Sequence, residues 1–359
     1  MFEYDLHIKN GEVVDGTGAP KFKADVIVDK GKIIGVFCPD NEDIRDKSEN
    51  HFLSNFKAKK VVNAEHKVVS PGFIDVHTHD DDNVFKDPSL SSKISQGVTT
   101  CIAGNCGISL APFSFKGTVP APIALLGKSD VFNYPRIKDY IDKFKSNPST
   151  VNVALLTGHS MLRVEAMNGD FDRPANSEEI SKMINKLEVA IQDGSIGLST
   201  GLAYPAANAA PTQEIIELTK ILPKYDAIFT THMRNEAVDV IKSVKETIEI
   251  TNTSNVRTVI SHHKCAGRSN WGKSRQTLKL IEAAKQNNFL DLDCYPYTAS
   301  STMLLKDFVK RADKVLVTWS DNFPDVSGQD LNDLAKQFGC NIDEAIDKLY
   351  PAGAIYFQM

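Results

Sequence analysis

The chain has 359 residues, of which 42% are hydrophobic and 24% are charged, an ordinary composition for a globular protein with a large core. Its net charge of −5, with both signs interspersed, argues against nucleic acid or an anionic membrane as a partner. No apolar run reaches the about 18 residues of a membrane span, and the charged start MFEYDLHIKNGEVVDG does not resemble a signal peptide. Six cysteines without CxxC pairs or dense spacing predict a reducing, cytoplasmic location.

Residues 1–69 are predicted to form a small β domain. Asn10-Gly11 lies between two alternating segments, a pattern typical of a hairpin turn. Lys30-Gly31 is expected at the turn of a second hairpin within ADVIVDKGKIIGV. The polar, aperiodic stretch from about 39 to 60 is expected to be a surface insertion, after which VVNAEHKVV resumes as a strand.

From residue 70 to 359, apolar strands alternate with helices. The candidate strands are 72–79, 97–105, 151–159, 195–202, 227–233, 256–263 and 289–297. Helices are expected over 177–194, with Asn176 as N-cap, Glu179 at the capping-box position and Gly194 as the stop, and over 212–226. Seven strands in this alternation favour an α/β fold of the TIM-like (β/α)₈ barrel type. The open doubly wound alternative lacks a GxGxxG after its first strand.

Histidines and a cysteine follow four of these strands at the point where each ends. His77 and His79 are two residues apart and therefore share a face of the first strand, while Cys106, His232 and His262 end three others. A single histidine at a strand end is more often a hydrogen-bonded core or loop residue than a ligand. Four strand ends converging at one barrel rim, where barrel active sites lie, predict a metal site instead.

Imidazole and thiolate ligands together suit zinc. A closed structural zinc site is the alternative, but such sites usually draw their ligands from close sequence pairs. His7, His51 and His66 are interpreted as surface residues, and Cys101, Cys265 and Cys294 as small core residues. His159 ends a strand and could line the pocket.

Six segments carry a resemblance to a known family: SPGFIDVHTHDD, GVTTCIAGNCGISLAP, GLSTGLAYPA, THMRNE, SHHKCAG and DCYPYTASSTML. In these the chain resembles the amidohydrolase superfamily and, within it, the N-acyl-D-amino-acid deacylases (D-aminoacylases). The resemblance extends from about residue 4 to the last residue. It implies a barrel with a small β-sandwich domain, and zinc-dependent hydrolysis of the amide of an N-acyl-D-amino acid, a small-molecule substrate, to a carboxylate and a D-amino acid.

The same resemblance implies roles for individual residues. His232, His262 and Cys106 would hold a tight zinc, and His77 and His79 a second, weaker one that shares Cys106. Tyr295 and Ser301 match positions that hold the substrate carboxylate, and Tyr204 matches a tyrosine of the same pocket. A nearby carboxylate would move the proton to the leaving amine.

The family's catalytic aspartate, which follows the eighth barrel strand in a GSDG-like motif, has no counterpart here. The sequence ends at YPAGAIYFQM, which in relatives comes just before that strand. We therefore expect an incomplete barrel of about seven strands, a C-terminally truncated fragment that binds zinc and has lost most amide hydrolysis. One alternative is a cyclic amidase of the hydantoinase or dihydroorotase type, but such an enzyme requires a bridging lysine, which the strand SIGLSTGL lacks. The other alternative is a non-catalytic metal-binding scaffold.

Overall fold

The computed structural model describes residues 2–38, 56–114, 119–120, 123–286 and 288–359. The chain divides into two compact units, Met1–Phe73 and Ile74–Met359. Most of the predicted insertion, together with His51, lies outside the described residues. Its last five positions belong instead to a strand, which begins at Phe56.

The described part of the N-terminal unit contains one five-stranded sheet, in the order β3-β2-β1-β4 with β5 paired to β1. Its strands are β1 (Phe2–Val13), β2 (Phe22–Asp29), β3 (Lys32–Phe37), β4 (Phe56–Asn63) and β5 (Val68–Val69). The second sheet layer that a β-sandwich requires is not among these described residues.

One of the two predicted hairpin turns is correct. Lys30 and Gly31, both with positive φ, connect β2 to β3, and Asp29 pairs with Lys32 across the turn. The prediction at Asn10-Gly11 is wrong, because β1 runs straight through it. Asn10 adopts the left-handed conformation, but it forms a bulge against β2 and the chain keeps its direction.

All seven predicted barrel strands are present, and each is shorter than expected. They form one sheet in the order β14-β13-β12-β11-β10-β7-β6, and its pairs from β7 to β14 are parallel. The strands are β6 (Phe73–Asp75), β7 (Val98–Ala103), β10 (Asn152–Gly158), β11 (Gly197–Gly201), β12 (Ile228–His232), β13 (Arg257–Ile260) and β14 (Leu290–Leu292). The described residues supply no eighth strand to this sheet, so β6 and β14 are its two edges.

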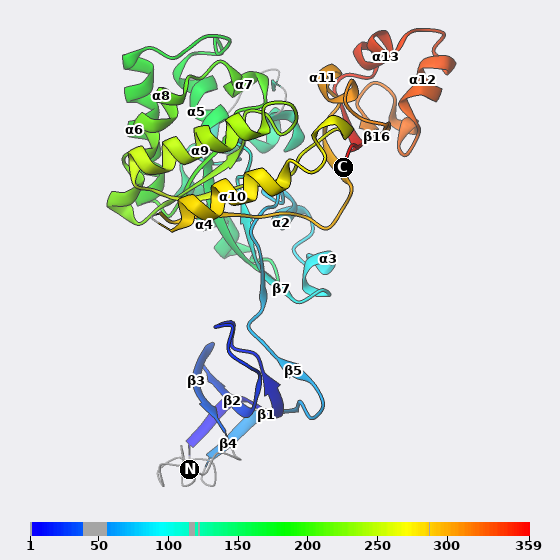
Figure 1. The fold of residues 1–359 in the computed structure, drawn as a ribbon. Helices are drawn as coiled ribbons and strands as arrows, with labels where there is room; N and C mark the ends of the chain where they lie inside the picture. Colours follow the sequence, from blue (N-terminus) through cyan, green and yellow to red (C-terminus); the bar gives the residue numbers. More distant parts are fainter. Residues whose placement is uncertain (1, 39–55, 115–118, 121–122, 287) are drawn as a thin grey trace. The chain divides into compact units, whose positions relative to one another are not determined.

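Helices connect the strands in the alternating pattern that the sequence predicts (Figure 1). They are α2 (Asn83–Lys86), α3 (Ser91–Ile94), α4 (Ile137–Ser146), α5 (His159–Ala166), α6 (Ser177–Gln192), α7 (Pro205–Asn208), α8 (Thr212–Thr219), α9 (Val240–Ser254) and α10 (Ser274–Lys285). Asn176 and Glu179 form the expected capping box of α6. The helix expected over 212–226 ends at Thr219 and continues as a separate 3₁₀ turn, Leu222–Tyr225, in which Pro223 has no N–H to donate.

A second, antiparallel sheet follows the last barrel strand. Its order is β15-β17-β16, formed by β15 (Ala299–Met303), β16 (Lys314–Ser320) and β17 (Ala352–Phe357), with α11 (Lys306–Val309), α12 (Leu331–Gln337) and α13 (Ile342–Leu349) between them. The segment AGAIYF is therefore β17 of this sheet. Its apolar side chains form a second core together with Cys106 and Tyr204, which connects this sheet to the barrel rim.

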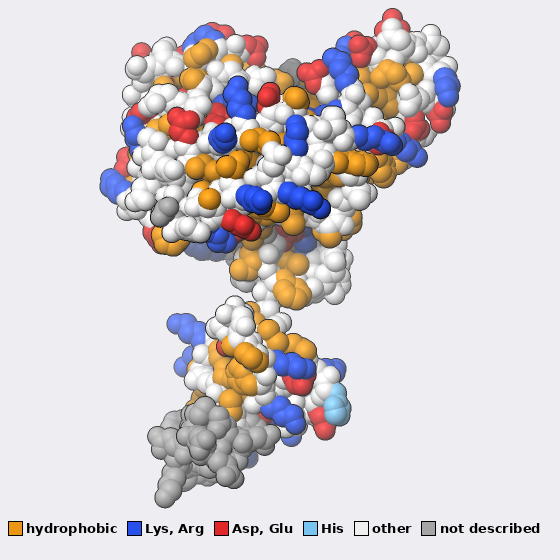
Figure 2. All heavy atoms as spheres, in the orientation of Figure 1, with side chains coloured by type: hydrophobic (Ala, Val, Ile, Leu, Met, Phe, Trp, Pro, Cys, Tyr) orange, Lys and Arg blue, Asp and Glu red, His pale blue; other side chains and the backbone are white. Residues whose placement is uncertain are grey.

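Charged side chains of both signs are interspersed on the visible surface (Figure 2), in keeping with the small net charge. No helix of the described chain has the length and apolarity needed to cross a bilayer.

Candidate metal centre

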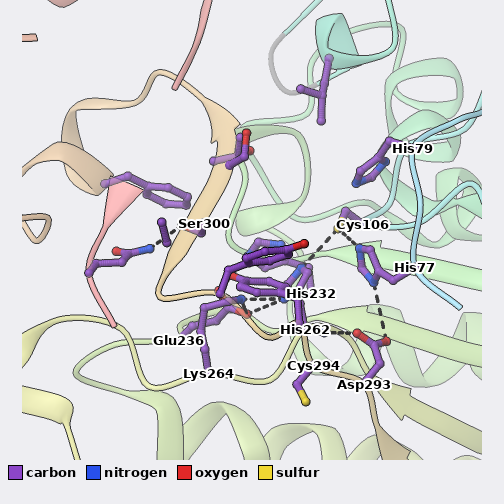
Figure 3. Close-up of a pocket in the computed structure, with 18 of the residues that line it drawn as sticks. His77, His79, Cys106, His232, Glu236, His262, Lys264, Asp293, Cys294 and Ser300 are labelled. Atoms are coloured by element: carbon purple, nitrogen blue, oxygen red, sulfur yellow. Dashed lines mark hydrogen bonds and ion pairs between the residues drawn. The ribbon is translucent and has the colours of Figure 1, made fainter. Parts of the chain in front are cut away.

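The side chains at four strand ends point into one cavity of about 500 Å³ (Figure 3). His77 follows β6, Cys106 follows β7, His232 is the last residue of β12, and His262 follows β13. His79, two residues beyond His77, lines the same cavity. Parallel strands bring their carboxyl ends to one edge of the sheet, which explains why residues so far apart in sequence meet.

The distances within this cluster suit metal coordination. Cys106 Sγ lies 3.3 Å from His77 Nε2 and 3.5 Å from His262 Nε2. Two sets of three potential ligand atoms each fall within 4.8 Å of one another: His77, His79 and Cys106 form one set, and Cys106, His232 and His262 the other. The thiol of Cys106 is thus common to both sets.

A tight loop places Cys106 at this position. Cys106 has a φ of 54°, and Gly104 before it and Gly107 after it also have positive φ. A Cβ at Gly104 would lie 2.2 Å from the carbonyl oxygen of Leu156, so only glycine fits there. Ser199 on β11 secures both ends of the loop, since its Oγ donates to Gly104 O (2.5 Å) and accepts from Gly107 N (3.0 Å).

Acidic side chains lie beside Nδ1 of two of the imidazoles, on the side of the ring away from Cys106. Glu236 Oε1 lies 2.8 Å from His262 Nδ1 and accepts a hydrogen bond from Lys264 Nζ at 2.7 Å. Lys264 Nζ is itself 2.8 Å from the same Nδ1. When His262 donates its Nδ1–H to Glu236, the lone pair on Nε2 faces Cys106, which is the orientation that a metal ligand needs. Asp293 lies in a comparable place beside His77.

The electrostatics of the pocket favour the thiolate form of Cys106. Burial raises the pKa of this thiol, but the nearby His77 and His262 outweigh burial and hold it well below its usual value. Burial also lowers the pKa of His77, yet Cys106 and Asp293 reverse this and raise it to about 10. The protonated imidazole and the thiolate therefore stabilise each other, and a bound cation would take the place of that proton.

Several buried polar atoms of the pocket lack hydrogen-bond partners within the described protein. They are both ring nitrogens of His232, Nδ1 of His79, Nδ1 of His77 and the hydroxyl of Tyr295. Buried polar groups are normally paired, so a cluster of unpaired atoms around one cavity points to a ligand bound there. Unpaired imidazoles beside a thiolate are the donor set that zinc prefers, and these residues therefore fit the metal.

The predicted substrate residues lie around the same cavity. Tyr204 is buried, contacts the ring of His232 at 4.7 Å between centroids, and bonds through its hydroxyl to Thr302 Oγ1 at 2.9 Å. Tyr295 and Ser301 also line the cavity, with Ser301 exposed at its mouth.

Sequence reasoning missed five charged residues that line the cavity: Asp75, Glu236, Lys264, Asp293 and Arg311. Lys264 lies two residues after His262, a spacing that could have suggested it shares the ligand's face. Arg311 has no such signal, because it reaches the cavity from the segment between α11 and β16.

Other histidines and cysteines fall into separate environments. His159 is fully buried and hydrogen-bonded to Glu214 at 3.0 Å, away from the metal cavity. Cys294 was expected in the core but is exposed and lines the cavity. His7 was expected at the surface, yet it is half-buried and lies 2.7 Å from Asp25 Oδ2, whereas His66 is exposed as expected.

The other two cysteines that were predicted to be small core residues pack as expected. Cys101 is buried within the main hydrophobic core and Cys265 packs against a smaller cluster near β13 and β14. Strand β11 contains no lysine, and Cys106 is the residue common to both ligand sets.

Comparison with known proteins agrees with this geometry. Residues 60–307 match the model of the amidohydrolase family. A D-aminoacylase from Alcaligenes xylosoxydans xylosoxydans is 41% identical over 356 residues, which cover 99% of this chain and 70% of that protein.

Solved structures give the same result. A D-aminoacylase crystal structure described as defining a novel subset of amidohydrolases has a TM-score of 0.90 at 42% identity, over 99% of this chain and 72% of that one. An N-acyl-D-glutamate deacylase from Bordetella bronchiseptica, solved with zinc and a phosphonate mimic of the tetrahedral intermediate, has the same TM-score and coverage at 38% identity. On these matches and the shared architecture, the chain belongs to the amidohydrolase family, within its group of D-aminoacylases and N-acyl-D-amino-acid deacylases.

Proposed function

We propose that this site serves zinc-dependent hydrolysis of N-acyl-D-amino acids, which yields a carboxylic acid and a free D-amino acid. One observation carries the proposal: a buried cysteine, Cys106, is shared by two three-residue ligand sets, and His77, His79 and His232 in these sets retain unpaired ring nitrogens. Relatives that match nearly the whole chain are deacylases of N-acyl-D-amino acids. A cyclic amidase is disfavoured because β11 offers no lysine as a bridging ligand.

The ligand sets divide into two sites in this proposal. Cys106, His232 and His262 hold the tight zinc, because these three are the more deeply buried set. His77 and His79 share Cys106 at the weaker second site. Bound zinc lowers the pKa of a coordinated water to about 7 and polarises the amide carbonyl.

The residues of the cavity wall bind the substrate. Tyr295 presents an unpaired hydroxyl and Ser301 lies at the mouth, where both can donate to the substrate carboxylate. Arg311 stacks on the ring of Phe308 at 4.0 Å and makes no salt bridge with the described residues. This guanidinium is therefore a further donor to a carboxylate, and Tyr204 shapes the cavity beside His232.

The carboxylates that line the cavity already have partners. Asp75 pairs with Lys93, Glu236 with Lys264, and Asp293 accepts from the backbone of His262. None of the three is free to take the proton from an attacking water and pass it to the leaving amine. We therefore expect the 359-residue chain to bind zinc and substrate but to hydrolyse slowly. The assignments of the chain as a fragment, of its cytoplasmic location and of a domain boundary near residue 70 stay predictions.

The test uses the purified 359-residue chain loaded with zinc. We expect binding of N-acetyl-D-methionine, measured by calorimetry, to be at least about tenfold tighter than binding of its L-enantiomer, and to disappear without metal. His263→Asn is a matched control, because the ring of His263 bonds to Thr277 and lies outside the metal sets. Zinc binding without any preference for the D-substrate would instead support a non-catalytic metal-binding scaffold. Rapid turnover would show that the pocket already contains its general base.

A further inference from the structure

Asp293 lies beside His77 and His262, one residue beyond the end of β14 (Figure 3). Its Oδ1 accepts a hydrogen bond from the backbone N–H of His262 at 2.6 Å, and its Oδ2 lies 3.7 Å from His77 Nδ1. Its side chain is only 14% exposed. A single carboxylate therefore faces one ligand of each metal site, and no described residue gives His77 Nδ1 a hydrogen-bond partner.

The contact with His262 supports an unfavourable backbone conformation. His262 has a φ of 37°, which is rare for a residue with a β-carbon. Asp293 holds this turn at three points: its N–H donates to Ile260 O (3.0 Å), its carbonyl accepts from His263 N (2.8 Å), and its carboxylate accepts from His262 N. The imidazole of His262 is thereby directed toward Cys106.

The contact with His77 connects the two edges of the open sheet. His77 follows β6 and Asp293 follows β14, and these strands are at opposite ends of the sheet order. A histidine that gives Nε2 to a metal normally donates its Nδ1–H to a carboxylate or carbonyl, which fixes both tautomer and ring orientation. Asp293 is the carboxylate at that position, and His77 Nε2 points at Cys106 Sγ from 3.3 Å.

We propose that Asp293 is a positioning residue that orients one ligand of each metal site, His262 through its backbone and His77 through its ring. This inference rests on the proposed metal function. In this proposal Oδ1 of Asp293 acts on His262 and Oδ2 acts on His77. A substitution that changes one oxygen can therefore separate the effect on one metal site from the effect on the other.

Asp293→Asn tests the assignment. The amide oxygen still accepts from the fixed His262 N–H, so the NH₂ group faces His77 and donates to Nδ1. His77 then carries its proton on Nε2 and cannot offer that lone pair to a metal. We expect the affinity for the second zinc to fall 10- to 100-fold, the range typical for loss of such a partner, and the first to change less than about threefold. Asp293→Ala removes both contacts and should weaken both sites.

Metal affinity is measured by competition with a chromophoric zinc chelator, and thiolate coordination by the ultraviolet absorption of the cadmium-loaded chain. Asp291→Asn is the matched control, because Asp291 is on the same strand but is exposed and paired with Lys285. An unchanged second affinity in Asp293→Asn would overturn the inference. Equal loss at both sites together with a lower melting temperature of the metal-free chain would also overturn it, because that result indicates a merely structural role. If the unsubstituted chain binds no metal, the proposed function itself fails.

Discussion

Two clusters in the barrel unit contain buried histidines and differ in the groups that surround the imidazoles. In the first, His159, Arg163 and Glu214 are fully buried, and the guanidinium of Arg163 donates to both oxygens of Glu214 and to three backbone carbonyls. In the second, both ring nitrogens of His232 and Nδ1 of His77 and of His79 lack partners around the thiol of Cys106, whereas in the first Nδ1 of His159 is the one unpaired ring nitrogen.

The difference shows how a structural cluster is distinguished from a binding site. An ion pair in which the guanidinium uses every donor has little left to offer a ligand, whereas several unpaired imidazole nitrogens around one thiol carry an energetic cost that a metal ion removes. Residue type alone would not separate His159 from His232, since both follow or end barrel strands.

The largest effect, a loss of zinc binding, is expected from Cys106→Ser. A serine hydroxyl is a poor zinc ligand, and Cys106 belongs to both ligand sets, so zinc content after dialysis should fall to near zero. Elemental analysis by mass spectrometry measures this directly. Cys101→Ser, in the core, should leave zinc content unchanged in the chains that fold. A Cys106→Ser chain that kept a full complement of zinc would contradict the shared-ligand model.

Glu214→Gln should break the structural cluster without touching the metal. It leaves the buried Arg163 without its counter-charge, and we expect unfolding to become easier by about 3–5 kcal/mol at pH 7. Denaturation by urea gives the change in stability, and zinc stoichiometry serves as the control. Loss of zinc at unchanged stability would mean that the two clusters are not independent.

The carboxylate of Glu214 should also make the free energy of unfolding depend on pH. Burial raises the pKa of Glu214, but the hydrogen bonds and charges of His159 and Arg163 outweigh burial and lower it to about 2. Because the folded-state pKa is depressed, the stabilisation is present above the unfolded value of 4.5 and is lost as pH falls toward about 2. The stability difference between the native chain and Glu214→Gln should therefore shrink below pH 4.5. A constant difference down to pH 3 would refute this assignment.

Removing zinc should have a moderate effect on stability. A ligand at about 100 times its dissociation constant stabilises the native state by about 2.7 kcal/mol, so chelation should lower the melting temperature measurably. The Glu214→Gln chain should show the same zinc-dependent shift, since its substitution lies outside the metal sets. A melting temperature insensitive to chelator would count against a bound metal.

The smallest effect is expected from Arg311→Gln, which removes one charged donor from the cavity wall. Binding of N-acetyl-D-amino acids should weaken at least about tenfold, because a hydrogen bond to a charged group contributes about 1.5–3 kcal/mol. Arg268→Gln is the control, since Arg268 is exposed and paired with Asp313. Equal effects of the two substitutions would exclude a specific role for Arg311.

Several local features of the structure can be predicted from the sequence alone. Three features depend on residues close together in the chain, and short-range geometry determines them: the alternation of strands and helices, the capping box at Asn176 and the turn at Lys30-Gly31. The shared strand face predicted for His77 and His79 is different, because β6 ends at Asp75 and both histidines lie in the loop beyond it. The five expected ligands lie around one cavity for a similar reason, because parallel strands always bring their carboxyl ends to one edge.

Other features of the fold and of the cavity depend on packing between segments that are far apart in the sequence. Asn10-Gly11 has the composition of a turn, but pairing of β1 with β2 and β4 kept the strand straight. The antiparallel sheet around β17, the approach of Arg311 to the cavity and the place of Asp293 between His77 and His262 depend on contacts between distant segments. Such contacts follow from the summed packing of many side chains, for which no single stretch of sequence carries a signal.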